Sequence, residues 1–136
     1  MNLLINFMNI EIKVYYEDTD ATGRVYNANY LKYLERARTE YIYNLDISHS
    51  FLKDKYSIYF VVKHIDIDFK KPAFFEDSLK VSTEIISFNK YKIVFHQIIK
   101  KEKLIIVDSK ISIVAIDQLG SLVKIPEILQ KKIGNI

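Results

Sequence analysis

The feature that most constrains this fold is a single amphipathic helix placed between segments that have the period of β-strands. Between Leu31 and Leu45, apolar side chains recur at every third or fourth position with charged residues between them, which is typical of a helix with one apolar face. Such a helix of about 18 residues is roughly 27 Å long, at about 1.5 Å per residue. It is therefore long enough to lie across a whole small sheet.

Strand patterns lie on both sides of this helix. Before it, residues 10–16 alternate apolar side chains with Glu11 and Lys13. After it, more strands are predicted near residues 56–70, 78–88, 91–101 and 104–116. The turns between them are short and polar, so successive strands should be antiparallel neighbours. The apolar phase of the first of them slips by one residue near Lys63, which predicts a bulge, and Pro126 opens a last short helix.

This order of elements predicts an α+β fold in which a five-stranded antiparallel sheet packs against one long helix. The 136 residues are interpreted as one domain. Met8 could itself begin the chain, so residues 1–7 are either an upstream start or a loosely ordered extension. One helix covers one face of such a sheet, and the remaining apolar surface favours assembly through the other face or through an edge strand.

Composition excludes several classes of function. The chain has no cysteine, which rules out disulfides, thiol nucleophiles and iron–sulfur clusters and fits a reducing cytoplasm. Its 3 glycines are too scattered for a nucleotide-binding phosphate loop. The net charge of +3 is too small and too dispersed to indicate nucleic acid. The apolar start is too short for a signal peptide or a membrane span, so we expect a soluble protein.

The loop between the first strand and the helix, residues 17–29 (EDTDATGRVYNAN), permits two interpretations. Asp18, Asp20 and Gly23 take the first, third and sixth places of a calcium-binding loop. The twelfth place, which should hold a bidentate glutamate, is Asn29, and a strand pattern precedes the loop where a helix should be. We therefore expect no metal here and favour a chemical role for one of the carboxylates.

The residues around this loop resemble a known family. The stretch VYYEDTDATGRVYNANYLKYLERARTEYI (14–42) resembles the signature of hotdog-fold acyl-CoA thioesterases of the Tol-Pal-associated (YbgC-like) and 4-hydroxybenzoyl-CoA thioesterase type. A second stretch, YFVVKHIDIDFKKPAFFED (59–77), resembles the strand after the central helix of that family. The resemblance implies a curved sheet wrapped around a long helix and hydrolysis of acyl-CoA without a cofactor. It also implies a homodimer, often paired into a homotetramer, with active sites at the subunit interface.

The resemblance places the family's essential carboxylate on Asp20, the aromatic side chain that flanks it on Tyr16, and the residue at the helix entrance on Asn27. Many members have a histidine where this chain has Asn27, and an asparagine cannot shuttle a proton near neutral pH. Asp20 could attack the thioester carbon or act as general base for water, and the sequence does not choose between the two. From spacing alone, Asp18 or Asp20 could equally cap a turn or the helix.

Thioester hydrolysis also needs donors at the carbonyl oxygen, where negative charge develops. The free backbone amides of residues 26–29, at the start of a long helix, could supply them. Gly23 would let the chain turn sharply and let the substrate approach closely. The candidates for substrate binding are Gly23, the possible acyl-pocket residues Tyr26, Tyr30 and Val62, and, for the phosphates of coenzyme A, Lys63, Lys90 and Lys92. Each of these could equally be ordinary core or solvated surface.

Two functions therefore stay open. The first is a thioesterase that acts on acyl-CoA or on an acyl group held by acyl carrier protein. The second is a hotdog module that binds an acyl carrier or a protein partner without turnover. The presence of asparagine and not histidine at position 27 favours this second function. Neither the acyl length nor the choice of carrier follows from the sequence.

Overall fold

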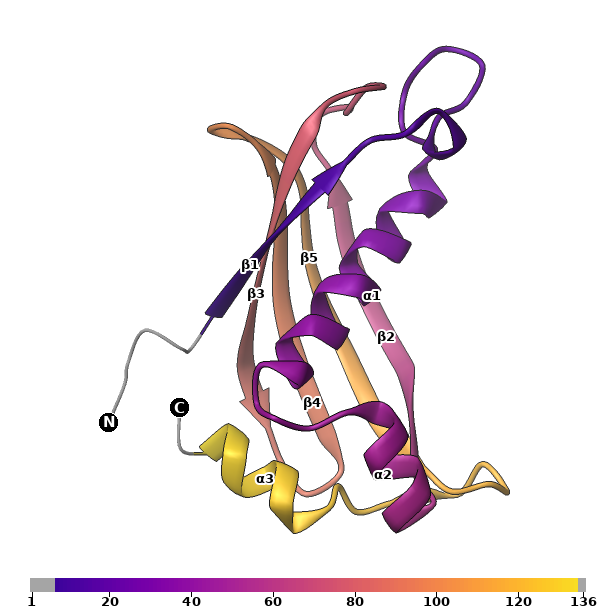
Figure 1. The fold of residues 1–136 in the computed structure, drawn as a ribbon, viewed down its shortest axis with the longest axis vertical. Helices are drawn as coiled ribbons and strands as arrows, with labels where there is room; N and C mark the ends of the chain where they lie inside the picture. The colour runs from indigo at the N-terminus through magenta and orange to yellow at the C-terminus, as the bar shows by residue number, and fades with distance from the viewer. Residues whose placement is uncertain (1–6, 135–136) are drawn as a thin grey trace.

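The computed structural model describes residues 7–134, which form one antiparallel sheet and a long helix across one of its faces (Figure 1). The strands are β1 (Phe7–Lys13), β2 (Tyr59–Phe69), β3 (Ser78–Phe88), β4 (Lys92–Lys101), β5 (Leu104–Ile116) and the short β6 (Leu122–Val123). The helices are the 3-10 turn η2 (Tyr16–Asp18), α1 (Asn27–Tyr43), α2 (His49–Tyr56) and α3 (Glu127–Gly134). The strand order is β1-β3-β4-β5-β2, and β6 pairs with β5.

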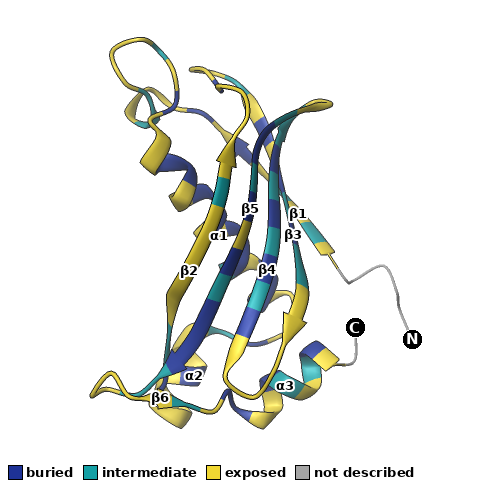
Figure 2. Ribbon diagram, turned by 180° about the vertical axis from the view of Figure 1, so that it is seen from behind, coloured by how far each residue is buried: buried dark blue, intermediate teal, exposed yellow. Residues whose placement is uncertain are grey.

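This architecture confirms the predicted hotdog fold, a five-stranded antiparallel sheet around one long helix, to which β6 adds a short piece. Seen from behind in Figure 2, the strands lie in front of α1, and β2 runs along one edge of the sheet, exposed over most of its length. The predicted bulge is also confirmed, because the pairing of β2 with β5 shifts between Val62 and His64, on either side of Lys63. None of the helices within residues 7–134 is long and apolar enough to cross a membrane.

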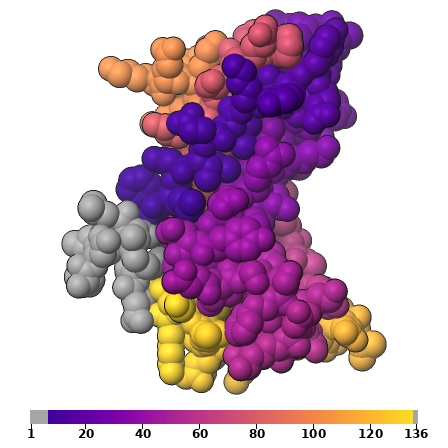
Figure 3. Space-filling model, in the orientation of Figure 1, coloured from indigo at the N-terminus to yellow at the C-terminus, as the bar shows by residue number. Residues whose placement is uncertain are grey.

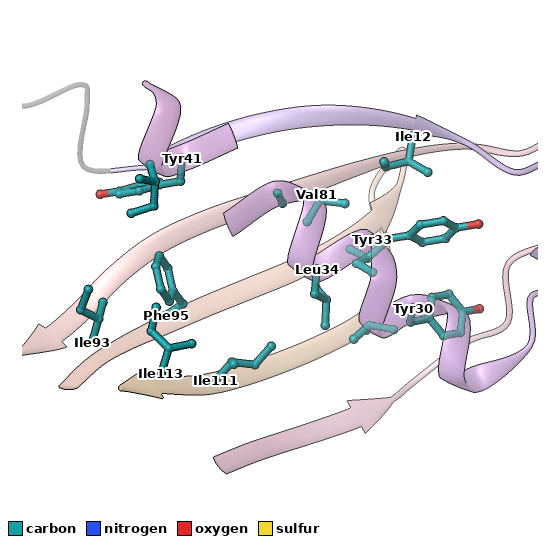
Figure 4. Close-up of a cluster of buried hydrophobic side chains, with 14 of the residues drawn as sticks. Ile12, Tyr30, Tyr33, Leu34, Tyr41, Val81, Ile93, Phe95, Ile111 and Ile113 are labelled. Atoms are coloured by element: carbon teal, nitrogen blue, oxygen red, sulfur yellow. The ribbon is translucent and has the colours of Figure 1, made fainter. Parts of the chain in front are cut away.

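The core lies between α1 and the inner face of the sheet. Side chains of α1 at helical spacing, including Leu34 (0% exposed) and Tyr41 (2% exposed), meet inward residues of the central strands (Figure 4). Tyr41 packs edge-on against Phe95 of β4, with ring centroids 5.8 Å apart. Burial of one such large side chain contributes about 1.5–3 kcal/mol to folding. The helix is therefore held on the sheet mainly by its apolar stripe.

A buried polar cluster fixes where α1 lies along the sheet. Gln97 of β4 is fully buried, and its amide nitrogen donates to the carbonyl oxygen of Leu34 and to Oγ1 of Thr83, both at 2.9 Å. The Gln97 amide oxygen accepts a hydrogen bond from Nη1 of Arg38 at 3.0 Å. Because these groups would cost stability if they were buried without partners, the bonds favour one position of the helix over its neighbours.

The structure corrects the predicted elements in three places. β1 ends at Lys13 although the apolar alternation continues to residue 16, because the Tyr15 N–H donates to Oδ2 of Asp18 at 2.8 Å and Tyr16–Asp18 form the turn η2. β2 begins at Tyr59, because residues 49–56 form α2, which the sequence did not predict. β6 was also not predicted. Of the proposed extension, residues 1–6 lie outside the described residues, and Phe7 already belongs to β1.

Candidate active site

The loop that carries Asp20 is closed at its base by Asp18. Oδ2 of Asp18 accepts the N–H of Tyr15 at 2.8 Å, and Oδ1 accepts from the side-chain amide of Asn29 at 2.7 Å. The Asp18 carbonyl oxygen accepts the N–H of Tyr26 at 3.0 Å. The loop is therefore joined at its start to η2 and at its end to the first turn of α1.

Asp20 lies in a tight turn inside this loop. Its Oδ1 accepts two hydrogen bonds from Thr22, from the backbone N–H at 2.8 Å and from the hydroxyl at 2.6 Å. The Asp20 N–H donates to the carbonyl of Arg24 at 2.8 Å, and Gly23 has a φ of 79°. A Cβ on Gly23 would meet nothing within 4 Å, so its backbone conformation, and not crowding by the chain, explains the glycine. The turn-capping role considered for Asp20 is thus present in the structure.

The same Asp20 lines an open cleft of about 430 Å³ between two segments. One wall comes from the loop and the start of α1, and consists of Asp20, Arg24, Val25, Tyr26, Asn27 and Tyr30. The other wall follows β2, and consists of Phe69, Lys70, Lys71 and Pro72. In Figure 3 the indigo to purple segment after β1 and the pink segment after β2 meet at the upper end of the molecule. A backbone bridge between Arg24 and Phe74 joins the two segments.

The carboxylate of Asp20 is ionised at neutral pH. Hydrogen bonds from the hydroxyl and the backbone N–H of Thr22 lower the pKa of Asp20 below its ordinary value, and the nearby positive charge of Arg24 adds to this effect. Both Thr22 bonds go to Oδ1, which leaves Oδ2 as the oxygen that can act on a substrate. An ionised, solvent-accessible carboxylate can serve as a nucleophile or as a general base.

The helix start supplies fewer free amides than the sequence predicted. Tyr26 N–H is taken by the Asp18 carbonyl, and Asn29 N–H donates to the Tyr26 carbonyl at 2.8 Å. Within residues 7–134 no hydrogen-bond acceptor takes the N–H groups of Asn27 and Ala28. These two amides, at the positive end of a 17-residue helix, are the ones that can bind a carbonyl oxygen.

Of the predicted site residues, the cleft brings together Asp20, Tyr26, Asn27 and Tyr30. Tyr30 is also a core residue, since it is 2% exposed and its hydroxyl accepts the Ala73 N–H at 3.0 Å. Tyr26 and Asn27 are exposed. Their roles in binding and catalysis stay predictions.

Other predicted site residues lie outside this cleft in the described chain. Tyr16 is 78% exposed and its ring packs against Phe75, with centroids 5.3 Å apart. Val62 lines a separate groove between α1 and β2. Lys63 is exposed at the bulge of β2. Lys90 and Lys92 lie at the turn from β3 to β4, at the opposite end of the sheet from the start of α1 (Figure 1). Gly23 is in the Asp20 turn but is also absent from the lining of the cleft.

Sequence reasoning missed three basic residues of the cleft. Arg24, Lys70 and Lys71 were not among the candidates for substrate binding. The structure places all three on the lining beside Asp20. A signal was present, because Lys70 and Lys71 lie at the end of the strand predicted near residues 56–70, but no local pattern tells a binding lysine from a solvated one.

The calcium-like pattern of the loop does not converge on one point. Asp18 faces Asn29 and Tyr15, whereas Asp20 faces Thr22. The Asn29 side chain donates through its nitrogen to Asp18 and so presents no oxygen there. Across residues 7–134 no group of three or more histidine, aspartate or glutamate side chains is placed to hold a metal ion.

Comparison with known proteins extends over nearly the whole chain. A family model described as the Thioesterase-like superfamily matches residues 14–133, which contain the Asp20 loop, α1 and strands β2 to β5. The acyl-CoA thioesterase YbgC of Haemophilus influenzae is 37% identical over 120 residues, 88% of this chain and 88% of that protein. The acyl-CoA thioester hydrolase YbgC of Escherichia coli O157:H7 is 37% identical over 109 residues, 79% of this chain and 81% of that protein. The crystal structure of a probable thioesterase from Bartonella henselae matches with a TM-score of 0.85 and 29% identity, covering 88% of this chain and 99% of that one.

Proposed function

Because the chain belongs to the Thioesterase-like superfamily, we propose that it hydrolyses acyl-CoA thioesters in the cleft that contains Asp20. One observation carries the assignment to this cleft: an ionised carboxylate lies on the same wall as a helix start with two unpaired amides. Relatives named acyl-CoA thioesterases cover most of the chain, which favours an enzyme over a non-catalytic binding module.

Each part of the reaction has a group to support it. The thioester carbonyl oxygen accepts hydrogen bonds from the N–H groups of Asn27 and Ala28, which stabilise the charge that develops on that oxygen. Asp20 attacks the thioester carbon, or takes a proton from a water that does so. The carbon–sulfur bond then breaks and the thiolate of coenzyme A takes up a proton. If Asp20 is the nucleophile, the acyl group is then held on Asp20 as a mixed anhydride, which water hydrolyses to the free acid and the regenerated carboxylate. If Asp20 is the general base, the water that attacked already makes the product a free acid. The overall reaction consumes only water, so the proposal includes no cofactor.

The positive charges around the cleft suit an anionic substrate. Arg24, Lys70 and Lys71 lie on its lining, and cations at a cleft raise the local concentration of anions such as the phosphates of coenzyme A. Lys90 and Lys92, at the other end of the sheet, would contact the same substrate only where a second subunit brings them to this cleft. Their predicted role in binding coenzyme A therefore depends on the oligomer.

We further propose that the chain forms a homodimer through β2. This strand is an edge of the sheet, so one side of its backbone lacks a partner strand within residues 7–134. Four of its large apolar side chains are 36–46% exposed, namely Val61, Val62, Ile65 and Phe69. An apolar edge strand pairs readily with a second copy of itself. Light scattering should give at least twice the 16.0 kDa chain mass at micromolar concentration, and an active species near 16.0 kDa would contradict the dimer.

A panel of acyl-CoA esters of increasing chain length, with free thiol as the readout, tests the activity. We expect hydrolysis well above the buffer rate for at least one ester. Binding without hydrolysis of any ester would instead favour the non-catalytic module. Esters of acyl carrier protein, run beside the panel, test the second predicted carrier. Cell fractionation tests the predicted cytoplasmic location, and light scattering also shows whether dimers pair into tetramers.

A further inference from the structure

Asp18 is linked to each end of the loop that holds Asp20. Its carboxylate accepts from Tyr15 before the loop and from Asn29 in the first turn of α1, and its carbonyl accepts from Tyr26 at the end of the loop. Burial acts to raise the pKa of Asp18, but the bonds from Tyr15 and Asn29 outweigh it and lower the pKa overall. The carboxylate is therefore charged at neutral pH, where its hydrogen bonds are strongest.

Asn29 connects Asp18 to α1, outside the turn in which Asp18 lies. It is 8% exposed, and a buried amide costs stability unless it is hydrogen-bonded. Its side chain donates to Asp18 at 2.7 Å across 11 residues of sequence. Asn29 also directly follows Asn27 and Ala28, whose amides are the unpaired ones. The Asp18–Asn29 bond therefore joins the loop that holds the carboxylate to the helical turn that holds the carbonyl-binding amides.

The buried hydroxyl of Tyr33 lies beside the same pair. Burial and the adjacent Asp18 carboxylate raise the pKa of this hydroxyl, although it has no partner at hydrogen-bond geometry within the described residues. Figure 4 shows Tyr30 and Tyr33 near each other, with both hydroxyls directed toward the start of α1. Their rings meet edge-on with centroids 6.2 Å apart. Tyr33 therefore packs against Tyr30 and places its hydroxyl beside the Asp18–Asn29 pair.

We propose that Asp18, acting through Asn29, is a positioning residue that sets the distance between the Asp20 carboxylate and the amides at the start of α1. The inference rests on the proposed function, because it concerns the same reaction. Asp18 itself is absent from the lining of the cleft, so it acts through geometry and not by touching the substrate. A misplacement of about 1 Å at a reacting centre can cost about 10²-fold in rate. Loss of the bond should therefore lower kcat more than it raises KM.

A cycle of four proteins tests this inference: wild type, Asn29→Asp, Asp18→Asn and the double variant. Asn29→Asp sets two carboxylates against each other and should lower kcat by about 10- to 100-fold at pH 8. Asp18→Asn should cost only a few-fold, because two facing amides can turn so that one accepts from the other. The double variant has again one carboxylate and one amide, with the roles exchanged. Its kcat should return to within about fivefold of wild type.

The pH dependence separates positioning from a general loss of stability. In Asn29→Asp, two close carboxylates share a proton as pH falls, so part of the lost kcat should return toward acidic pH. The other ionisable groups near Asp18 are Arg36 and Tyr33 of α1, and the pKa of Tyr33 is raised by burial and by the Asp18 carboxylate, away from the acidic range. Circular dichroism and light scattering must show that each variant is folded and assembled as the wild type is. Should Asn29→Asp fail to fold, Asn29→Leu removes the donor at similar size, and we expect a kcat loss that Asp18→Asn does not rescue.

Two results would overturn the inference. One is a kcat for Asn29→Asp, or for the leucine variant, that equals the wild-type value. The other is a double variant that is no more active than Asn29→Asp. A wild-type protein that hydrolyses no thioester would instead contradict the proposed function. That failure is seen with the wild type alone, before any variant is measured.

Discussion

Replacing Asp20 by asparagine should remove most of the turnover and leave the fold intact. Asparagine keeps an oxygen that can accept both Thr22 bonds, at 2.6 and 2.8 Å in the structure, so the turn should keep its shape. The variant loses the negative charge and the basicity of the carboxylate. A positioned general base contributes about 10²–10⁴-fold to a rate, so kcat should fall by about 10²-fold or more. KM should change little, because the other residues of the cleft are unchanged.

The assay is steady-state release of thiol from the best ester of the acyl-CoA panel. The matched control is Asp18→Asn, which makes the same change of charge two positions away, at a carboxylate that does not line the cleft. That control should lose only a few-fold in kcat. Light scattering and circular dichroism should be the same for all three proteins. If Asp20→Asn retains more than about a tenth of the wild-type kcat, Asp20 is neither nucleophile nor general base.

Four further substitutions test the site and the core. Asn27→Ala should slow turnover by about tenfold or less, because it removes one hydrogen bond of about 0.5–1.5 kcal/mol. A loss as large as that of Asp20→Asn would instead make the Asn27 side chain a principal catalytic group. Asn27→His should add an ionisation near the imidazole pKa of about 6.5 to the pH–rate profile. The Thr22 hydroxyl lowers the pKa of Asp20, so Thr22→Val should raise that pKa. The fall of kcat/KM on the acidic side of its pH profile should then move to higher pH. An unchanged profile would argue against Asp20 as the ionising group. Leu34→Ala removes a side chain that is 0% exposed and should lower the free energy of unfolding in urea by about 2–5 kcal/mol, and a change below about 1 kcal/mol would contradict the packing described.

The long elements could be predicted because each has a clear period. α1 has one apolar stripe, and β3, β4 and β5 alternate over ten or more residues, so their bounds were close to those observed. α2 has no such signal, since Leu52 is the only one of its eight residues that is buried. It is defined by its caps: Ser48 accepts the N–H of Phe51 at 3.0 Å, and Ser57 ends the helix with a φ of 54°. Serine is common in loops, so neither cap could be recognised in advance.

The cleft could be predicted only on the side that is continuous in sequence. Asp20 and Asn27 are close in the chain, so a strand–loop–helix pattern brings them together. Lys70 and Lys71 reach the cleft because the Val25 N–H donates to the Ala73 carbonyl at 2.9 Å, and no local pattern encodes a pairing between segments so far apart. Of the amides predicted to be free at residues 26–29, only those of Asn27 and Ala28 are unpaired. This result depends on the exact path of the loop, which sequence periodicity does not describe.

The strand order has a consequence for how the protein reaches its active form. β3, β4 and β5 pair with their neighbours in sequence, whereas β1 pairs with β3 in a register that sets Lys13 opposite Ser78. Contacts between distant parts of a chain cost more loop-closure entropy and form more slowly. The Asp20 loop directly follows β1, so the cleft is complete only after β1 has joined the sheet. During refolding, amide protection in β4 and β5 should therefore return before thioester hydrolysis does, and a newly made chain would hold a folded sheet before it is a catalyst.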